Sequence, residues 1–200
     1  MVYEELLPKI EEFSRQLMGD DYAHGFPHVQ RVLRWAENIV EHEKLQVDWF
    51  VLRAAVYLHD IGRRLGEPHA YYSALLARGY LLELGVDKET VERVVNAILC
   101  HSFSLAQKLK VEPLGPEARV LHDADKLDAL GLVGFSRVFW FGAERRHDLQ
   151  YMLNHFRNKI LRLKDMLYFD YSKKVAEELH EKVKAAVEEL CRELGAGAGI

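Results

Sequence analysis

A histidine and an aspartate stand side by side in the segment Tyr57-Leu58-His59-Asp60-Ile61-Gly62, at the end of an apolar run. Helical spacing places His59 four residues after Ala55, so its imidazole should point into the core. Asp60 continues the row that runs through Val56, and a carboxylate is rarely buried unless it is paired or bound to a metal. The two side chains can converge only on something that sits between them, and a metal ion meets that demand.

Two further residues complete a set of metal ligands. His28 lies one turn before Val32 on the inward stripe of a predicted helix, and Asp125 shares a helical face with Leu121. With His59 and Asp60 they would come from three helices. Two imidazoles and two carboxylates suit Mn, Fe, Co, Ni or Mg better than a thiolate-type zinc site would. The His-Asp pair alone is weak evidence, because short motifs have low specificity.

Apolar side chains recur at helical spacing along the chain, and Gly, Pro and Asp mark the boundaries. The pattern predicts helices over residues 3–18, 27–40, 48–62, 68–84, 87–101, 116–128, 130–146, 148–167 and 172–194. Residues 102–116 contain Pro113 and Pro116 and are predicted to be a loop with local turns. The sequence has no strand alternation and no hairpin turn signal, so the predicted class is all-α.

The 200 residues are 49% hydrophobic and 29% charged, which predicts one globular domain over 1–194 and a flexible tail over 195–200. A formal net charge of −4 gives no footprint for nucleic acid. The start of the chain lacks the apolar region of a signal peptide, and no window reaches the length of a membrane span. We therefore expect a cytoplasmic protein without nucleic-acid or membrane partners. Cys100 and Cys191 lie far apart in helical patterns, which argues against a disulfide or a thiolate metal site.

Several segments, taken in order, resemble the HD-domain family of metal-dependent phosphohydrolases. The pieces that carry the resemblance are His28-Val29-Gln30-Arg31-Val32, His59-Asp60-Ile61-Gly62 and Asp123-Ala124-Asp125-Lys126-Leu127-Asp128, with weaker likeness at His69, Ser73-Ala74, His101-Ser102 and His155-Phe156. The resemblance covers roughly residues 18–190 and implies a single helical bundle with the metal site between its helices. It implies a divalent metal held by His28, His59, Asp60 and Asp125. The preference for Asp125 over Asp123 rests on the family pattern and on the face shared with Leu121, and Asp128 stays open as an alternative.

The activity that the resemblance implies is hydrolysis of a small phosphorylated metabolite by metal-activated water. The favoured substrate is a nucleotide, either a nucleoside mono- or triphosphate. Asp60 could accept the proton of the water, as could Asp125. Arg31, Arg63 and Lys126 are the cations nearest in sequence to the ligands and could bind the phosphate, although a salt bridge or a solvated charge is an equally good interpretation of each.

His69 and His101 have two possible roles. In two-metal relatives of the family, histidines in similar places hold a second ion, whereas in one-metal relatives they line the pocket and can act as catalytic acid or base. Ser102 follows His101 where the two-metal pattern has another histidine, which favours one metal. The alternatives are a two-iron oxygenase built on the same scaffold and a metal-binding module without catalytic activity.

Overall fold

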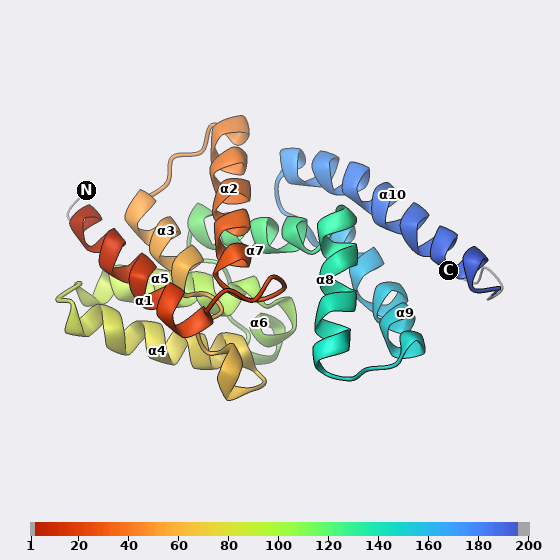
Figure 1. Ribbon diagram of the computed structural model, residues 1–200. Helices are drawn as coiled ribbons and strands as arrows, with labels where there is room; N and C mark the ends of the chain where they lie inside the picture. The colour runs from red at the N-terminus through yellow and green to blue at the C-terminus, as the bar shows by residue number, and fades with distance from the viewer. Residues whose placement is uncertain (1–2, 196–200) are drawn as a thin grey trace. The chain divides into compact units, whose positions relative to one another are not determined.

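The computed structural model describes residues 3–195, which form helices and turns and contain no strand (Figure 1). This confirms the all-α class. The chain divides into two compact units, one that ends at Asp125 and one that begins at Lys126. A single domain over 1–194 stays a prediction. Residues 196–200, most of the predicted flexible tail, lie outside the described residues.

Among its described residues, the first unit contains six complete α-helices and two short 3-10 helices. The α-helices are α1 (Leu7–Met18), α2 (Phe26–Glu43), α3 (Trp49–Leu58), α4 (His69–Glu83), α5 (Lys88–His101) and α6 (Phe103–Leu109), and the 3-10 helices lie at Glu4–Leu6 and Arg63–Leu65. Helix α7 (Pro116–Asp128) ends just past the boundary. The second unit contains α8 (Gly131–Glu144), α9 (Leu149–Asn158), a 3-10 helix at Ile160–Met166 and α10 (Asp170–Glu193).

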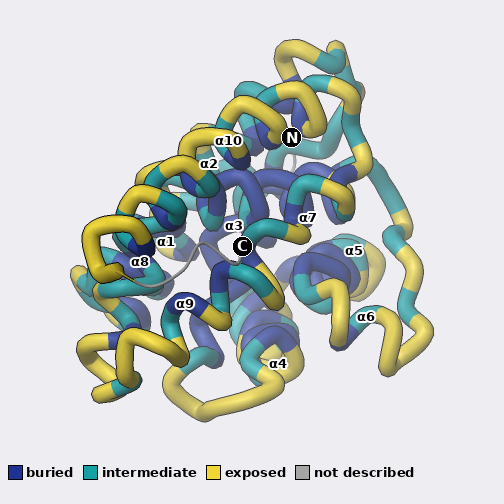
Figure 2. The backbone as a smooth tube through the Cα atoms, turned by 90° about the vertical axis from the view of Figure 1, so that its right-hand side faces the viewer, coloured by how far each residue is buried: buried dark blue, intermediate teal, exposed yellow. Residues whose placement is uncertain are grey.

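Helix α3 is the centre of the first unit. All its residues except Trp49 and Arg53 are buried, as expected of a helix that is apolar all round (Figure 2). It packs against α1, α2, α4 and α5. The predicted cap Asp48 accepts hydrogen bonds from the backbone N–H groups of Phe50 and Val51, which fixes the start of the helix. The segment that follows α3, which begins with His59 and Asp60, therefore lies in the middle of the unit.

Three segments differ from the sequence-based expectation. The helix predicted over 48–62 ends at Leu58, and residues 59–62 form a turn. Residues 103–109, predicted to be loop, form α6, because Leu105 is buried against the unit while Lys110 ends the helix in a left-handed conformation. The predicted helix over 148–167 breaks at Lys159, where φ is −130°, and continues as a 3-10 helix. Side chains three residues apart eclipse in a 3-10 helix, which allows both Ile160 and Leu163 to be buried.

A charged network ties together three helices of the first unit. Glu117 at the start of α7 is 4% exposed, and its Oε1 accepts the backbone N–H of Asp48 at 2.8 Å. Arg93 of α5 donates to that same oxygen at 3.1 Å and to Asp48 Oδ2 at 3.0 Å. One buried carboxylate thus fixes the starts of α3 and α7 against the middle of α5.

We expect Glu117→Ala to lower the free energy of unfolding by about 2 kcal/mol, because it leaves the backbone N–H of Asp48 without its acceptor and removes one of the two carboxylates that Arg93 contacts. Urea unfolding followed by circular dichroism measures the change. The control is Glu92→Ala, which breaks an exposed pair with Arg78 at 2.7 Å and should cost about 0.5 kcal/mol or less. Equal losses in the two variants would contradict the proposed importance of the network.

No helix within residues 3–195 combines the length and the apolar character that crossing a bilayer requires.

Candidate metal centre

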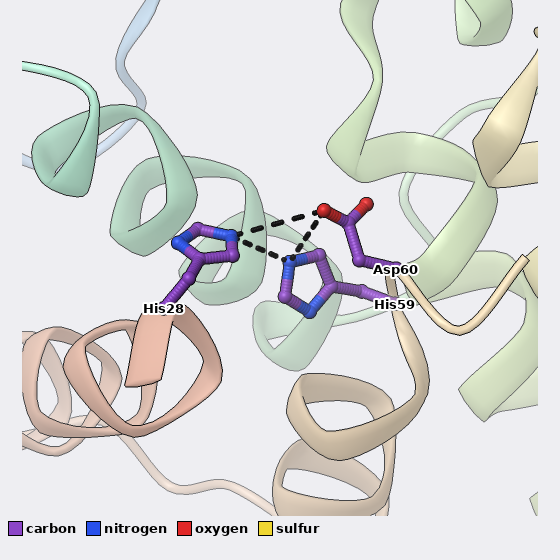
Figure 3. A group of neighbouring side chains, drawn as sticks. All are labelled: His28, His59 and Asp60. Carbon is purple, nitrogen blue, oxygen red and sulfur yellow. Dashed lines mark hydrogen bonds and ion pairs between the residues drawn. The ribbon is translucent and has the colours of Figure 1, made fainter. Parts of the chain in front are cut away.

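The four residues predicted to bind a metal lie close together inside the first unit. Figure 3 shows three of them, His28, His59 and Asp60. His28 lies in the first turn of α2, and Asp125 lies in α7. His59 and Asp60 follow directly after α3 in a turn, although the backbone of His59 keeps helical angles of φ −62° and ψ −31°. His28, His59 and Asp60 are fully or almost fully buried, whereas the side chain of Asp125 is 27% exposed.

The ligand atoms of these four residues lie close together. His28 Nε2 is 3.2 Å from His59 Nε2 and 3.4 Å from Asp125 Oδ1. Asp60 Oδ2 is 3.9 Å from the Nε2 atoms of both histidines. His28, His59 and Asp60 each offer one atom within 4.8 Å of the others, so this group could hold a metal ion.

The protonation of His59 favours a cation in this position. Its Nδ1 lies 2.7 Å from the carbonyl oxygen of Val56, and since a carbonyl can only accept, Nδ1 must carry the proton. Nε2 of the neutral ring therefore presents a lone pair to the nitrogen of His28 and to the carboxylate of Asp60. A backbone contact of this kind is the usual way in which a metal-binding imidazole is oriented.

A second group shares Asp60 with the first. Its Oδ1 lies 3.3 Å from His69 Nε2 and 3.7 Å from His101 Nε2. This oxygen is buried and has no hydrogen-bond partner among the described residues. His101 Nδ1 donates to the carbonyl oxygen of Ile98 at 2.5 Å, so Nε2 of the neutral ring also carries a lone pair. Asp60, His69 and His101 form a second group that could hold a cation. The sequence prediction favoured a single metal, because Ser102 follows His101 where two-metal relatives have a histidine.

The protonation states in the site are those that metal binding requires. Burial lowers the pKa of His59, and burial together with the charge of His59 lowers the pKa of His101 to about 3. Burial alone would raise the pKa of Asp60, but Arg63 and the surrounding histidines outweigh it and hold that pKa well below its usual range. Burial likewise would raise the pKa of Asp125, but the hydrogen bond with His28 and the charges of the surrounding histidines together outweigh it and hold that pKa well below its usual range. Neutral imidazoles and ionised carboxylates are the ligand forms, so the residues fit a divalent ion.

The three predicted substrate cations lie in different environments. Arg63 donates to Asp60 Oδ2 from Nε at 2.8 Å and from Nη2 at 2.7 Å, so its guanidinium orients a predicted metal ligand. Arg31 donates to the carbonyl oxygen of Tyr22 at 3.1 Å, and its guanidinium lies over the aromatic ring of the same tyrosine. Lys126 is 6% exposed and follows Asp125 directly in α7. Binding of phosphate by these side chains stays a prediction.

The other two aspartates of α7 have different partners. Asp123 is buried, and its Oδ1 accepts from His122 Nδ1 at 3.1 Å. Asp128 accepts from Arg137 Nη1 at 2.6 Å within the second unit. Asp125 contacts His28, with 3.4 Å between its Oδ1 and His28 Nε2.

Sequence reasoning missed Glu67, whose carboxylate contacts the ring of His69. The only sequence signal is a spacing of two residues, which does not separate Glu67 from any other exposed glutamate.

Comparisons with known proteins agree with this geometry. The HD domain family matches residues 25–130. The Bacillus subtilis protein YpgQ is 35% identical over 191 residues, which are 93% of this chain and 92% of YpgQ. The crystal structure of YpgQ in complex with ADP has a TM-score of 0.75 at 30% identity and covers 96% of this chain and 97% of its own. An HD-superfamily hydrolase from Bacillus thuringiensis has a TM-score of 0.70 at 28% identity, over 96% and 98% of the two chains. The four residues predicted to bind a metal lie within the matched segment, and this chain belongs to the HD domain family.

Proposed function

We propose that the protein is a metal-dependent phosphohydrolase that acts on a nucleotide. The observation that carries the proposal is the position of Asp60, whose two carboxylate oxygens each face a pair of histidine Nε2 atoms. Support for a nucleotide comes from YpgQ, which was crystallised with ADP. Support for hydrolysis comes from the HD-superfamily hydrolase of similar fold.

In this proposal His28, His59, Asp60 and Asp125 hold the ion. A divalent ion supplies two things to phosphate hydrolysis: it lowers the pKa of a water molecule and it polarises a phosphoryl oxygen. The ionised carboxylate of Asp60 is available to take the proton from the attacking water. Asp125 has the same capacity, and its partly exposed side chain is the more accessible to solvent.

His69 and His101 contribute the remaining proton-transfer groups. The ring of His101 donates from Nδ1 to the carbonyl oxygen of Ile98, so its Nε2 offers a lone pair to a proton or a cation. The ring of His69 neighbours it, with a distance of 5.6 Å between the two ring centroids, and 16% of the His69 side chain is exposed. An exposed edge on an otherwise buried cluster is where a phosphate could enter.

The experiment that tests the function is a release screen. The protein is stripped of metal, reloaded with Mn, Mg, Co or Ni, and assayed for phosphate and pyrophosphate release from nucleoside mono-, di- and triphosphates and from sugar phosphates. Metal-dependent release from one nucleotide class is the expected result. Release from sugar phosphates alone would overturn the nucleotide assignment, and no release with any metal would favour the module without catalytic activity.

The second candidate function is the two-iron oxygenase, which the group of Asp60, His69 and His101 favours. Iron analysis and oxygen consumption distinguish the two enzymes. Two irons per chain together with oxygen uptake would replace the hydrolase proposal.

Lys126 allows substrate binding to be separated from metal binding. We expect Lys126→Met to raise KM by roughly 10-fold, the cost of one charge-assisted hydrogen bond to phosphate, with the metal content unchanged. Methionine keeps the volume of a side chain that is 6% exposed. The control is Lys173→Met, whose side chain is 51% exposed. If kcat/KM stayed at the wild-type value, Lys126 would not belong to the site.

A further inference from the structure

Glu67 makes two contacts with His69 that no motif predicts. Its carboxylate oxygens lie 3.1 and 3.0 Å from His69 Nδ1, and Oε2 also accepts the backbone N–H of His69 at 3.1 Å. His69 is the first residue of α4, and the cap residue Pro68 provides no side-chain hydrogen bond. One exposed glutamate therefore both caps α4 and holds the imidazole at its start.

These contacts determine which ring nitrogen carries the proton. An ionised carboxylate can only accept, so Nδ1 of His69 donates to Glu67, and in a neutral ring Nε2 then carries the lone pair. The contacts at Nε2 do not select a tautomer, because Arg63 Nη2, which can only donate, lies 3.5 Å away and Asp60 Oδ1, which can only accept, lies 3.3 Å away. The contact of Nδ1 with Glu67 is therefore the one that decides between the two tautomers.

His69 differs from His59 and His101, two of the other histidines around Asp60, in how its ring is held. His59 and His101 donate from Nδ1 to the backbone carbonyl groups of Val56 and Ile98 in their own helical segments. Those acceptors cannot be removed by a side-chain substitution. The acceptor for His69 is a side chain that is 76% exposed.

We propose that Glu67 is a positioning residue that keeps His69 in the Nδ1-protonated tautomer and aims its Nε2 at Asp60. Its effect on turnover rests on the proposed function, whereas its effect on the tautomer does not. The residue acts through His69 alone, so its removal should have no consequence once His69 is gone.

The tautomer is measured directly by NMR on metal-stripped protein labelled with ¹⁵N-histidine. The pH is raised until the nitrogen shifts of the ring stop changing, and the shifts of the two nitrogens then report which one is protonated. The signal of His69 is identified by its loss in His69→Asn. We expect a protonated Nδ1 in the wild type and in Glu67→Gln, whose amide oxygen still accepts, and a mixture of tautomers in Glu67→Ala. An Nε2-protonated ring in the wild type, or an unchanged ring in Glu67→Ala, would overturn the proposal.

A double-mutant cycle tests the consequence for turnover. We expect Glu67→Ala to reduce kcat/KM by roughly 10-fold, the usual effect of removing a group that orients a metal-site histidine, and to have no further effect in the His69→Asn background. An equal loss in both backgrounds would show that Glu67 acts independently of His69.

The control variant is Glu92→Ala, which removes another exposed carboxylate, 55% accessible, from a surface pair and should change neither the ring shifts nor kcat/KM. Because Glu67 is exposed, both variants should keep the wild-type circular dichroism spectrum. If the wild type releases no phosphate from any nucleotide, the proposed function fails and the tautomer measurement still decides the role of Glu67.

Discussion

We expect the Asp60→Asn variant to bind no metal and to have a kcat/KM at least about 1,000-fold below that of the wild type. A metal ion provides several kcal/mol of transition-state stabilisation, and this contribution is lost when the ion no longer binds. Asp60 is the residue common to both groups that could hold a cation. Oδ2 lies 3.9 Å from His28 and His59, while Oδ1 faces His69 and His101. Asparagine keeps the shape of the side chain but removes the charge that attracts the ion.

The measurement combines metal analysis after dialysis with the nucleotide release assay. Asp170→Asn is the control, because that aspartate is 95% exposed and forms a surface ion pair with Lys173. Far-UV circular dichroism should show that both variants keep their helices. Metal retention by Asp60→Asn at wild-type affinity would contradict the proposed centre, whatever the effect on turnover.

His59→Ala distinguishes the two groups that share Asp60. His59 belongs to the group with His28 and not to the group with His69 and His101. Loss of one metal with retention of another in this variant would indicate two ions per chain. Loss of all metal would indicate that a single ion binds beside His28.

The helices and the inward histidines could be predicted from the sequence because they depend on local periodicity. The cap at Asp48 and the burial of His28, His59 and His101 follow from helical spacing alone. The 3.4 Å contact between His28 and Asp125, 97 positions apart in the chain, could not be derived from spacing. It was expected only because the three motifs occur in the order of a known family.

The contacts of the charged side chains could not be predicted. Arg63 was expected either to bind substrate or to form a salt bridge, and its guanidinium lies on the carboxylate of Asp60. Its binding of phosphate stays a prediction. Its position depends on the turn after α3 and on the rotamer of a long side chain, and the sequence specifies neither. Glu67 could not be predicted either, because its contact with His69 depends on where the ring of that histidine lies, which the sequence does not specify. Helix α6 was missed because Pro113 and Pro116 dominate the local composition of a segment that nevertheless buries Leu105.

Gly62 occupies a position where the turn after Asp60 touches the backbone of α4. Its N–H donates to Ser73 Oγ at 2.9 Å. A Cβ at this position would overlap the backbone nitrogen of Ser73 and lie 2.6 Å from the carbonyl carbon of Tyr72. Its φ of −86° is open to every residue, so the glycine is required by the close approach and not by its backbone conformation.

We therefore expect Gly62→Ala to lower the free energy of unfolding by roughly 3 kcal/mol, the upper part of the range for overpacking, since the obstacle is backbone that cannot change rotamer. The variant should also lose metal affinity and activity, because the same displacement separates Asp60 from His69 at the start of α4. Chemical unfolding and metal titration measure both effects.

Gly79→Ala provides the matched control within the same helix. A Cβ there meets no described atom within 4 Å beyond its chain neighbours and its own helix backbone, and the position lies inside α4. Alanine in a helix interior should raise the free energy of unfolding by about 0.5–1 kcal/mol. Replacing glycine by alanine should thus raise the free energy of unfolding at position 79, inside α4, and lower it at position 62, in the turn that contacts α4. Wild-type stability in Gly62→Ala would mean that α4 can move away from the turn, and the close packing would then not be what holds His69 beside Asp60.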